Sequence, residues 1–272
     1  MKSEVFNGQR FWTYFKYDIT QMWRNHVKAC IAIGLAGIIL YMLYVILSLL
    51  LGNGWSGPGL LPRIVVFIIA GTALELYQTR TYGYLTDKRK GSAWLMTPAS
   101  TFEKWLSMML MTLIILPGLL MIVYLFTDLL ISAIDPTVGQ SIITSVTVGF
   151  NELTEGIMGV NAEYNTTWSL WTFVPLLLIS HVFNFLFFLL CGICFKKNKI
   201  LSAFVIILLV SLLLSAFTSS FAMNYYTNID LRDFAEAEEY LRNTFSTSLW
   251  VTSILSVGLA GGVFYRLKTL KH

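Results

Sequence analysis

The sequence carries little charge for its length. Only 12% of its 272 residues are charged, whereas 56% are hydrophobic. In a soluble domain about a quarter of the residues are charged, because charged side chains cover its surface in water. The composition therefore excludes an ordinary soluble globular protein and predicts that lipid covers much of this chain.

Cysteine and histidine are scarce as well, with three residues of each. Cys30 stands alone, and Cys191 and Cys194 form a C-x-x-C, so no disulfide framework is indicated. The C-x-x-C has the spacing of a redox or metal site, but no second ligand pair accompanies it, and two small residues at the end of a helix explain it. No Gly-Lys pair occurs, which excludes the phosphate-binding loop G-x-x-x-x-G-K-[ST]. We therefore expect a chain with no catalytic residue, cofactor or metal of its own.

The hydrophobic residues gather in runs of about 20, the length of a helix that crosses a hydrocarbon core of roughly 30 Å. In lipid every backbone donor and acceptor must be paired within the chain, so such runs form helices. We predict an all-α polytopic membrane protein with six transmembrane helices, near residues 29–51, 61–77, 106–131, 171–191, 200–221 and 245–265. Residues 1–28 then form an N-terminal segment, residues 29–265 the transmembrane domain and residues 266–272 a short tail.

Basic residues alternate between the connections. All lysines and arginines except Arg63, Arg232 and Arg242 fall before the first span, after the second, after the fourth or after the sixth. Acidic residues gather in two long connections on the opposite side, near 132–169 and 222–244. The positive-inside rule places both termini in the cytoplasm, which predicts an N-in, C-in protein of the plasma (inner) membrane. The net charge of +4 thus reflects topology, and nothing indicates a nucleic-acid partner.

Residues 10–26, before the first span, have the pattern of an amphipathic helix. One arc of about 120° carries the apolar side chains Phe11, Trp12, Phe15, Ile19, Met22 and Trp23. Arg10 and Arg24 lie on the opposite face. Tryptophan at headgroup depth and a basic polar face are typical of a helix that lies in the membrane interface, in contact with lipid. A helix packed against a partner or against the protein's own loops is the alternative.

The connection between the second and third spans contains a helix start. Ser100 and Glu103 form an S-x-x-E capping box, and Pro98 disfavours helix just upstream. We therefore expect a helix to begin at Ser100 and to continue into the third span. Before it lie three apolar side chains that we expect to face water: Trp94, Leu95 and Met96. Such a cluster beside a basic run suggests either a docking surface for a partner or a contact with the bilayer.

The stretch from Leu95 to Lys104, LMTPASTFEK, resembles the L-P-x-S-x-x-E segment of ABC-2-type transporter permeases, with Thr97-Pro98 in place of Leu-Pro. Six spans, a preceding amphipathic helix and cytoplasmic termini are also similar to that family. The resemblance implies the permease subunit of an exporter that forms a homodimer or heterodimer and binds a separate ATP-hydrolysing subunit. It assigns contact with that ATPase to the connection that includes Trp94, Leu95, Met96, Ser100, Glu103 and Lys104.

Ionisable residues inside the spans favour other functions. Glu75, Asp128 and His181 are candidates because a buried charge is costly in lipid. If these residues take part in transport, the chain is an ion-coupled transporter. A regulatory membrane protein without an ATPase partner is a further alternative. Hydrogen bonds between helices are the structural alternative. The G-x-S-G at residues 54–57 is the motif of an intramembrane serine protease with Ser56 as nucleophile and His181 as base. Against this, a turn explains every glycine, and His181 in the middle of the fourth span does not match the depth of Ser56.

Overall fold

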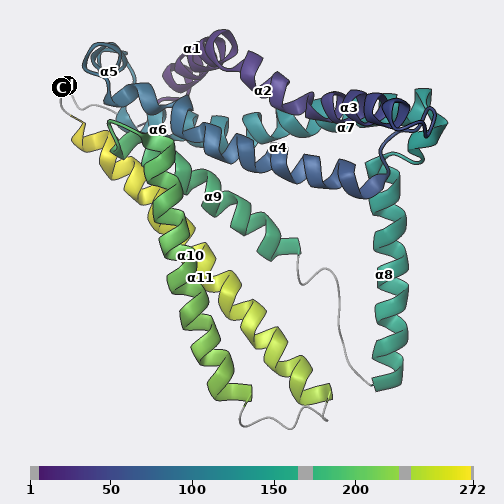
Figure 1. Ribbon diagram of the computed structural model, residues 1–272. Helices are drawn as coiled ribbons and strands as arrows, with labels where there is room; N and C mark the ends of the chain where they lie inside the picture. The colour runs from purple at the N-terminus through teal and green to yellow at the C-terminus, as the bar shows by residue number, and fades with distance from the viewer. Residues whose placement is uncertain (1–5, 165–173, 227–233, 271–272) are drawn as a thin grey trace.

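The computed structural model describes residues 6–164, 174–226 and 234–270, and every regular element in these ranges is a helix (Figure 1). In chain order the α-helices are α1 (Gly8–Asn25), α2 (Val27–Gly34), α3 (Ala36–Leu50), α4 (Leu60–Thr81), α5 (Lys88–Leu95), α6 (Thr101–Leu110), α7 (Leu116–Ile134), α8 (Ile142–Tyr164), α9 (Val174–Cys194), α10 (Lys199–Tyr226) and α11 (Phe234–Thr269). Short 3-10 turns lie at Gly83–Thr86 (η1) and Pro136–Val138 (η3), and a π-helical turn at Met111–Ile115 (η2) joins α6 to α7.

Five helical stretches are long and apolar enough to cross a membrane. They are Val27–Leu50, Leu60–Thr86, Thr101–Ile134, Val174–Cys194 and Arg242–Thr269. Each coincides with a predicted span apart from its ends, although residues 171–173 of the fourth predicted span lie outside the described residues. The fifth predicted span, 200–221, falls on α10, whose apolar part with described side chains is Lys199–Leu212. The all-helical membrane class predicted from the sequence is thus confirmed, and a count of six spans stays a prediction.

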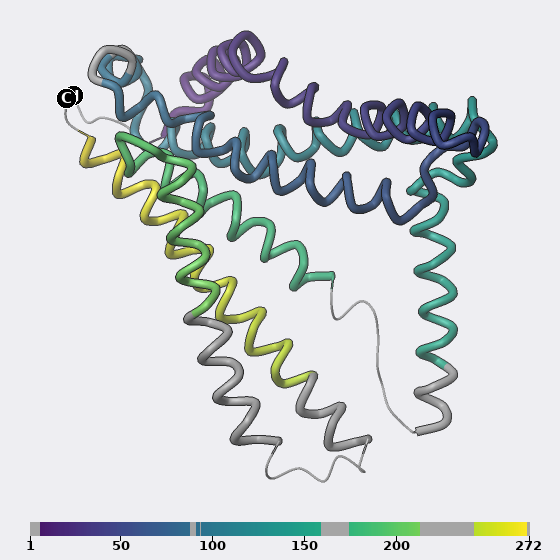
Figure 2. Tube along the Cα trace, viewed as in Figure 1, coloured from purple at the N-terminus to yellow at the C-terminus, as the bar shows by residue number. Residues whose placement is uncertain are grey.

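The helices form two groups that meet along α4 and α9. In the first group α2, α3, α4 and α7 pack side by side, and in the second α9 packs against α10 and α11 (Figures 1 and 2). The end of the molecule that holds α1, α5 and the α9–α10 turn is called the α1 end below. The opposite end, from which α8 departs, is called the α8 end. The α1 end gathers the segments that carry most of the basic residues.

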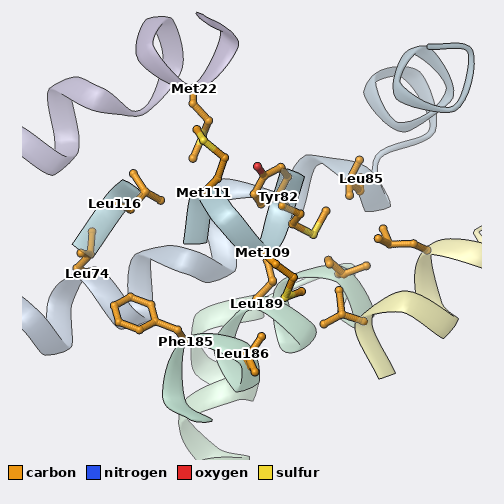
Figure 3. Close-up of a cluster of buried hydrophobic side chains, with 14 of the residues drawn as sticks. Met22, Leu74, Tyr82, Leu85, Met109, Met111, Leu116, Phe185, Leu186 and Leu189 are labelled. Carbon is orange, nitrogen blue, oxygen red and sulfur yellow. The ribbon is translucent and has the colours of Figure 1, made fainter. Parts of the chain in front are cut away.

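The main apolar core lies where the two groups meet near the α1 end. Figure 3 shows Leu74 and Tyr82 from the α4 side, Met109 and Met111 from the α6–η2 segment, and Leu186 from α9 around one centre. The π-helical turn ends at Ile115, two residues before Pro117, whose backbone nitrogen has no hydrogen to donate. A wider turn changes the register there, so that α6 and α7 continue as one long helical segment.

Gly192 sets how closely α4 and α9 approach. A Cβ added to it would lie 2.5 Å from the carbonyl oxygen of Thr79 and 2.8 Å from the Cα of Thr79. Both atoms belong to the α4 backbone, which cannot turn aside as a side chain can. The absence of a side chain at Gly192 therefore permits the contact, as small residues do between membrane helices.

We expect Gly192→Ala to lower the free energy of unfolding by about 1–3 kcal/mol, the usual cost of overpacking a tight contact. Gly262→Ala in α11 is the matched control, because its Cβ would meet only the side chain of Leu190, at 3.6 Å. The free energy of unfolding of both variants is measured on the purified proteins in detergent. Equal stability of the two would show that α4 and α9 have room to separate.

Candidate functional site

The predicted helix start after the second span is confirmed. Ser100 is the N-cap of α6, its Oγ accepts from the Glu103 backbone N–H at 3.2 Å, and Glu103 Oε2 accepts from the Ser100 backbone N–H at 2.8 Å. This reciprocal pair satisfies two N–H groups that a helix start otherwise leaves unpaired. Because α6, η2 and α7 follow without a break, the cap fixes the beginning of a long helical segment to the connection before it.

Glu103 also joins that connection to α1. Its side chain is fully buried and accepts from Arg10 Nε at 2.8 Å and from the backbone N–H of Asn7 at 2.8 Å. Asn7 is itself the N-cap of α1, with its side chain accepting from the N–H groups of Gln9 and Arg10. One carboxylate therefore holds the starts of two helices, which the capping-box pattern alone does not predict.

The apolar cluster before α6 is only partly exposed. Trp94 was expected to face water but is 6% exposed, because its Nε1 donates to the hydroxyl of Tyr14 in α1 at 2.9 Å. Lys104 is buried beside it and donates to the Trp94 carbonyl oxygen at 2.9 Å, with its ammonium 4.6 Å from the centre of the Trp94 ring. This pairing satisfies the last carbonyls of α5 with a cation, as helix C-termini favour. The expectation of exposure was thus wrong for Trp94, which lies between α1 and α6.

Leu95 and Met96 remain accessible, with Met96 83% exposed. Next to them in the chain, Thr97 and Pro98 line one side of a groove of about 600 Å³. The other side is the first half of α1, from Gln9 to Tyr17. Accessible apolar side chains beside a groove, on a support held by buried polar contacts, form a surface suited to binding another protein.

A buried carboxylate holds the middle of α1. Asp18 is 4% exposed, and its Oδ2 accepts from Tyr82 at 2.9 Å and from Ser107 at 2.6 Å. Burial raises the pKa of Asp18, and these two hydrogen bonds act against that rise. Since Tyr82 follows α4 and Ser107 lies in α6, this carboxylate ties α1 to both helices. On the helical wheel Asp18 lies at the edge of the apolar arc, beside Met22, and this position is the signal in the sequence that its side chain is buried.

The apolar arc predicted for α1 divides between two surroundings. Phe15 and Met22 are buried and Ile19 packs beside them, so this part of the arc contacts the protein itself. Trp12 and Trp23 point outward, 54% and 60% exposed. The packing alternative is therefore correct for the first part, and the interfacial interpretation stays a prediction for the two tryptophans.

Asp128 is paired with Arg63, which sequence reasoning did not single out. Both are buried at the α8 end, where Arg63 NH1 lies 2.8 Å from Asp128 Oδ1. Arg63 also donates to the carbonyl oxygens of Val138 and Gln140, and Asp128 Oδ2 accepts from the Ile142 N–H at 2.6 Å. The pair therefore fixes α4, α7 and the start of α8 together. The signal available in the sequence is that opposite charges stand at the same end of two spans.

Asp135 explains the G-x-S-G segment. Its carboxylate accepts from Tyr41 at 2.8 Å, from Trp55 Nε1 at 2.9 Å and from Thr137 Oγ1 at 2.7 Å. These hydrogen bonds, that from Thr137 foremost, hold the pKa of Asp135 at about 2. The Gly57 N–H donates to Thr137 Oγ1 at 2.9 Å, and a Cβ on Gly57 would lie 2.4 Å from Val138. The tryptophan and the second glycine of the segment thus have structural roles at a turn.

Glu75 and His181 are brought together. His181 Nδ1 lies 2.8 Å from Glu75 Oε1, which joins α4 to α9 beside the main core. Glu75 is buried, whereas the His181 side chain is 61% exposed. Glu75 engages Nδ1 of His181, so Nε2 is the ring nitrogen left to face another partner.

Three acidic side chains that the sequence singled out therefore each bind other residues of the same chain: Glu103, Asp128 and Glu75. Within the described residues, no group of three or more acidic, histidine or cysteine side chains could hold a metal ion. No protein-family model matches the chain, and neither a curated protein nor a solved structure matches it.

Proposed function

We propose that this chain is the transmembrane permease subunit of an ABC exporter, which moves its substrate with ATP energy from a separate ATPase subunit. The observation that carries the proposal is the construction of the α1 end. Leu95 and Met96 stand exposed on a support that Glu103, Lys104 and Asp18 fasten to the beginning of the α6–α7 segment. A partner that pushes on this surface therefore moves a helix long enough to cross the membrane.

The transmission path follows from the covalent and polar links. The exposed residues end α5, the Ser100–Glu103 capping box starts α6, and α6 continues through η2 into α7. Movement of α7 reaches Asp128 and Arg63 at the other end. Such rigid-body movement of helices is the usual way in which a local contact becomes a change of access. In this arrangement the α1 end faces the cytoplasm, both termini are cytoplasmic, six helices span the plasma (inner) membrane and two permease subunits pair.

A pull-down in mild detergent from the native cells tests the proposal. We expect the wild-type chain to recover an ATPase subunit and the double variant Leu95→Asp, Met96→Asp to lose it, because charge on an apolar docking surface opposes burial. The double variant Thr20→Asp, Asn25→Asp is the matched control, since it adds the same two charges at exposed positions of α1.

Recovery of the ATPase with all three chains would keep the ABC proposal and refute Leu95 and Met96 as its contact. A stable, monodisperse wild-type preparation without an ATPase would overturn the ABC assignment. The second candidate would then gain support, an ion-coupled transporter or a regulatory membrane protein. The observation that favours it is the Glu75–His181 pair, because an accessible histidine next to a buried carboxylate within two spans suits proton or cation binding.

A further inference from the structure

In the part of the chain whose side chains are described, the buried contacts of α8 lie at its beginning. Ser141 and Ile142 are buried against α4 and α7, and the Ile142 N–H binds Asp128. From residue 143 to residue 158 every side chain of α8 is exposed or only partly covered. Figure 1 shows α8 running across the direction of α4 and α7 after it leaves the end of α7.

The exposed part of α8 is amphipathic. Apolar side chains recur at helical spacing and share one face: Ile143, Val146, Phe150, Leu153 and Ile157. The other face is mixed: it carries the polar side chains Thr144, Thr147, Asn151, Glu152 and Glu155 together with Val148 and Met158, which are 44% and 60% exposed. Val146 is 50% exposed and Leu153 60% exposed, so these two side chains of the apolar face are accessible. In water such a face would have to be covered.

α8 begins beside the exposed apolar ends of two candidate membrane spans. Where α8 departs, the adjoining ends of α4 and α7 expose Leu61, Phe126 and Ile134, in helices that are apolar enough to cross a membrane. A helix that starts at this level and runs across α4 and α7 lies along the membrane surface at which those two spans end. Its Glu152 and Glu155 then face water, while its apolar side chains reach the acyl chains.

We propose that α8 is an interfacial helix, whose apolar face binds the lipid leaflet at the α8 end of the molecule. Residues 142–164 contain no lysine or arginine, so apolar burial holds the helix and attraction to anionic headgroups contributes nothing. Through the bond from Ile142 to Asp128, lipid that holds α8 also holds the Arg63–Asp128 pair.

Spin labels on single cysteines test this proposal in the full chain reconstituted in phosphatidylcholine vesicles. Cys194 is exposed and is first replaced by serine, so that it does not take up the label. Cys30 and Cys191 are buried and are kept. Labels at Val146→Cys and Leu153→Cys report on the apolar face, and labels at Thr144→Cys and Glu155→Cys on the polar face. Ile122→Cys on α7 is the lipid reference and Met96→Cys the water reference, since both positions are exposed.

We expect collisions with oxygen relative to a water-soluble nickel chelate to be severalfold higher at 146 and 153 than at 144 and 155. The ratio at positions 146 and 153 should resemble that at position 122, and the ratio at positions 144 and 155 should resemble that at position 96. Adding phosphatidylglycerol to the vesicles should leave these ratios unchanged. Chelate access at all four positions would place α8 in water and overturn the proposal. Shielding of 146 and 153 from both reagents would overturn it too, because protein would then cover the face. If a variant of the apolar face fails to fold, Ile143→Cys takes its place. If a variant of the polar face fails to fold, Asn151→Cys takes its place.

Discussion

Replacing Arg63 by alanine should destabilise the protein more than any other single change discussed here. Asp128 would keep a buried carboxylate without its cation, and the carbonyl oxygens of Val138 and Gln140 would lose their donor. Removal of one partner from a buried ion pair costs about 3–5 kcal/mol, because the other charge stays away from water. We expect a loss of that size in the free energy of unfolding, measured by denaturant in mixed micelles.

Two further variants separate the ion pair from its hydrogen bonds. Asp128→Asn keeps one amide oxygen for the Ile142 N–H, but it leaves the buried Arg63 cation without a counter-charge. Its cost should therefore fall toward the lower end of the same range, about 3 kcal/mol. The double variant Arg63→Leu, Asp128→Leu should recover part of the loss, since no lone charge stays buried. Arg24→Ala, at an exposed position of α1, serves as the control for loss of an arginine. If Arg63→Ala were no more destabilising than Arg24→Ala, the pair would not hold this end together.

Sequence reasoning located the helices because their cause is local. Runs of apolar residues of membrane length and a capping box are written in consecutive positions, and the structure has helices at each. The start of α11 at Phe234 is well before the predicted span, because the acidic stretch after it is also composed of good helix formers. Composition limits what can sit in lipid but does not end a helix at the membrane surface.

The partners of charged residues were not predictable in the same way. Asp18, Arg63 and Glu103 each bind groups that are distant in the chain, and only the fold brings them together. Trp94 was expected to face water because it lies in the connection between two spans, yet Tyr14 of α1 accepts its indole N–H. A pattern in one segment cannot predict which segment packs over it. Exposure of single side chains in a connection therefore needs the three-dimensional structure.

Glu103→Ala should release α1 from the rest of the α1 end. The change removes the reciprocal cap of α6 and leaves the Asn7 N–H without its acceptor, for a total of about 2–4 kcal/mol in the free energy of unfolding. Ser100→Ala is the matched control, because it removes the cap but leaves the bonds of Glu103 to Asn7 and Arg10; it should cost about 1 kcal/mol. Arg10→Ala should cost no more than about 1 kcal/mol, since its side chain is 37% exposed and water screens the pair.

Limited proteolysis distinguishes a released α1 from a general loss of stability. In Glu103→Ala we expect cleavage within α1 under conditions in which Ser100→Ala stays intact, because only the first variant cuts the link between the two helices. Cleavage of both at the same rate would mean that Asp18, bound to Tyr82 and Ser107, holds α1 without help from Glu103. Under the proposed function the released α1 should also uncouple transport from ATP hydrolysis. The ATPase would then still be recovered with the variant, since Leu95 and Met96 remain, but its activity would no longer respond to the permease.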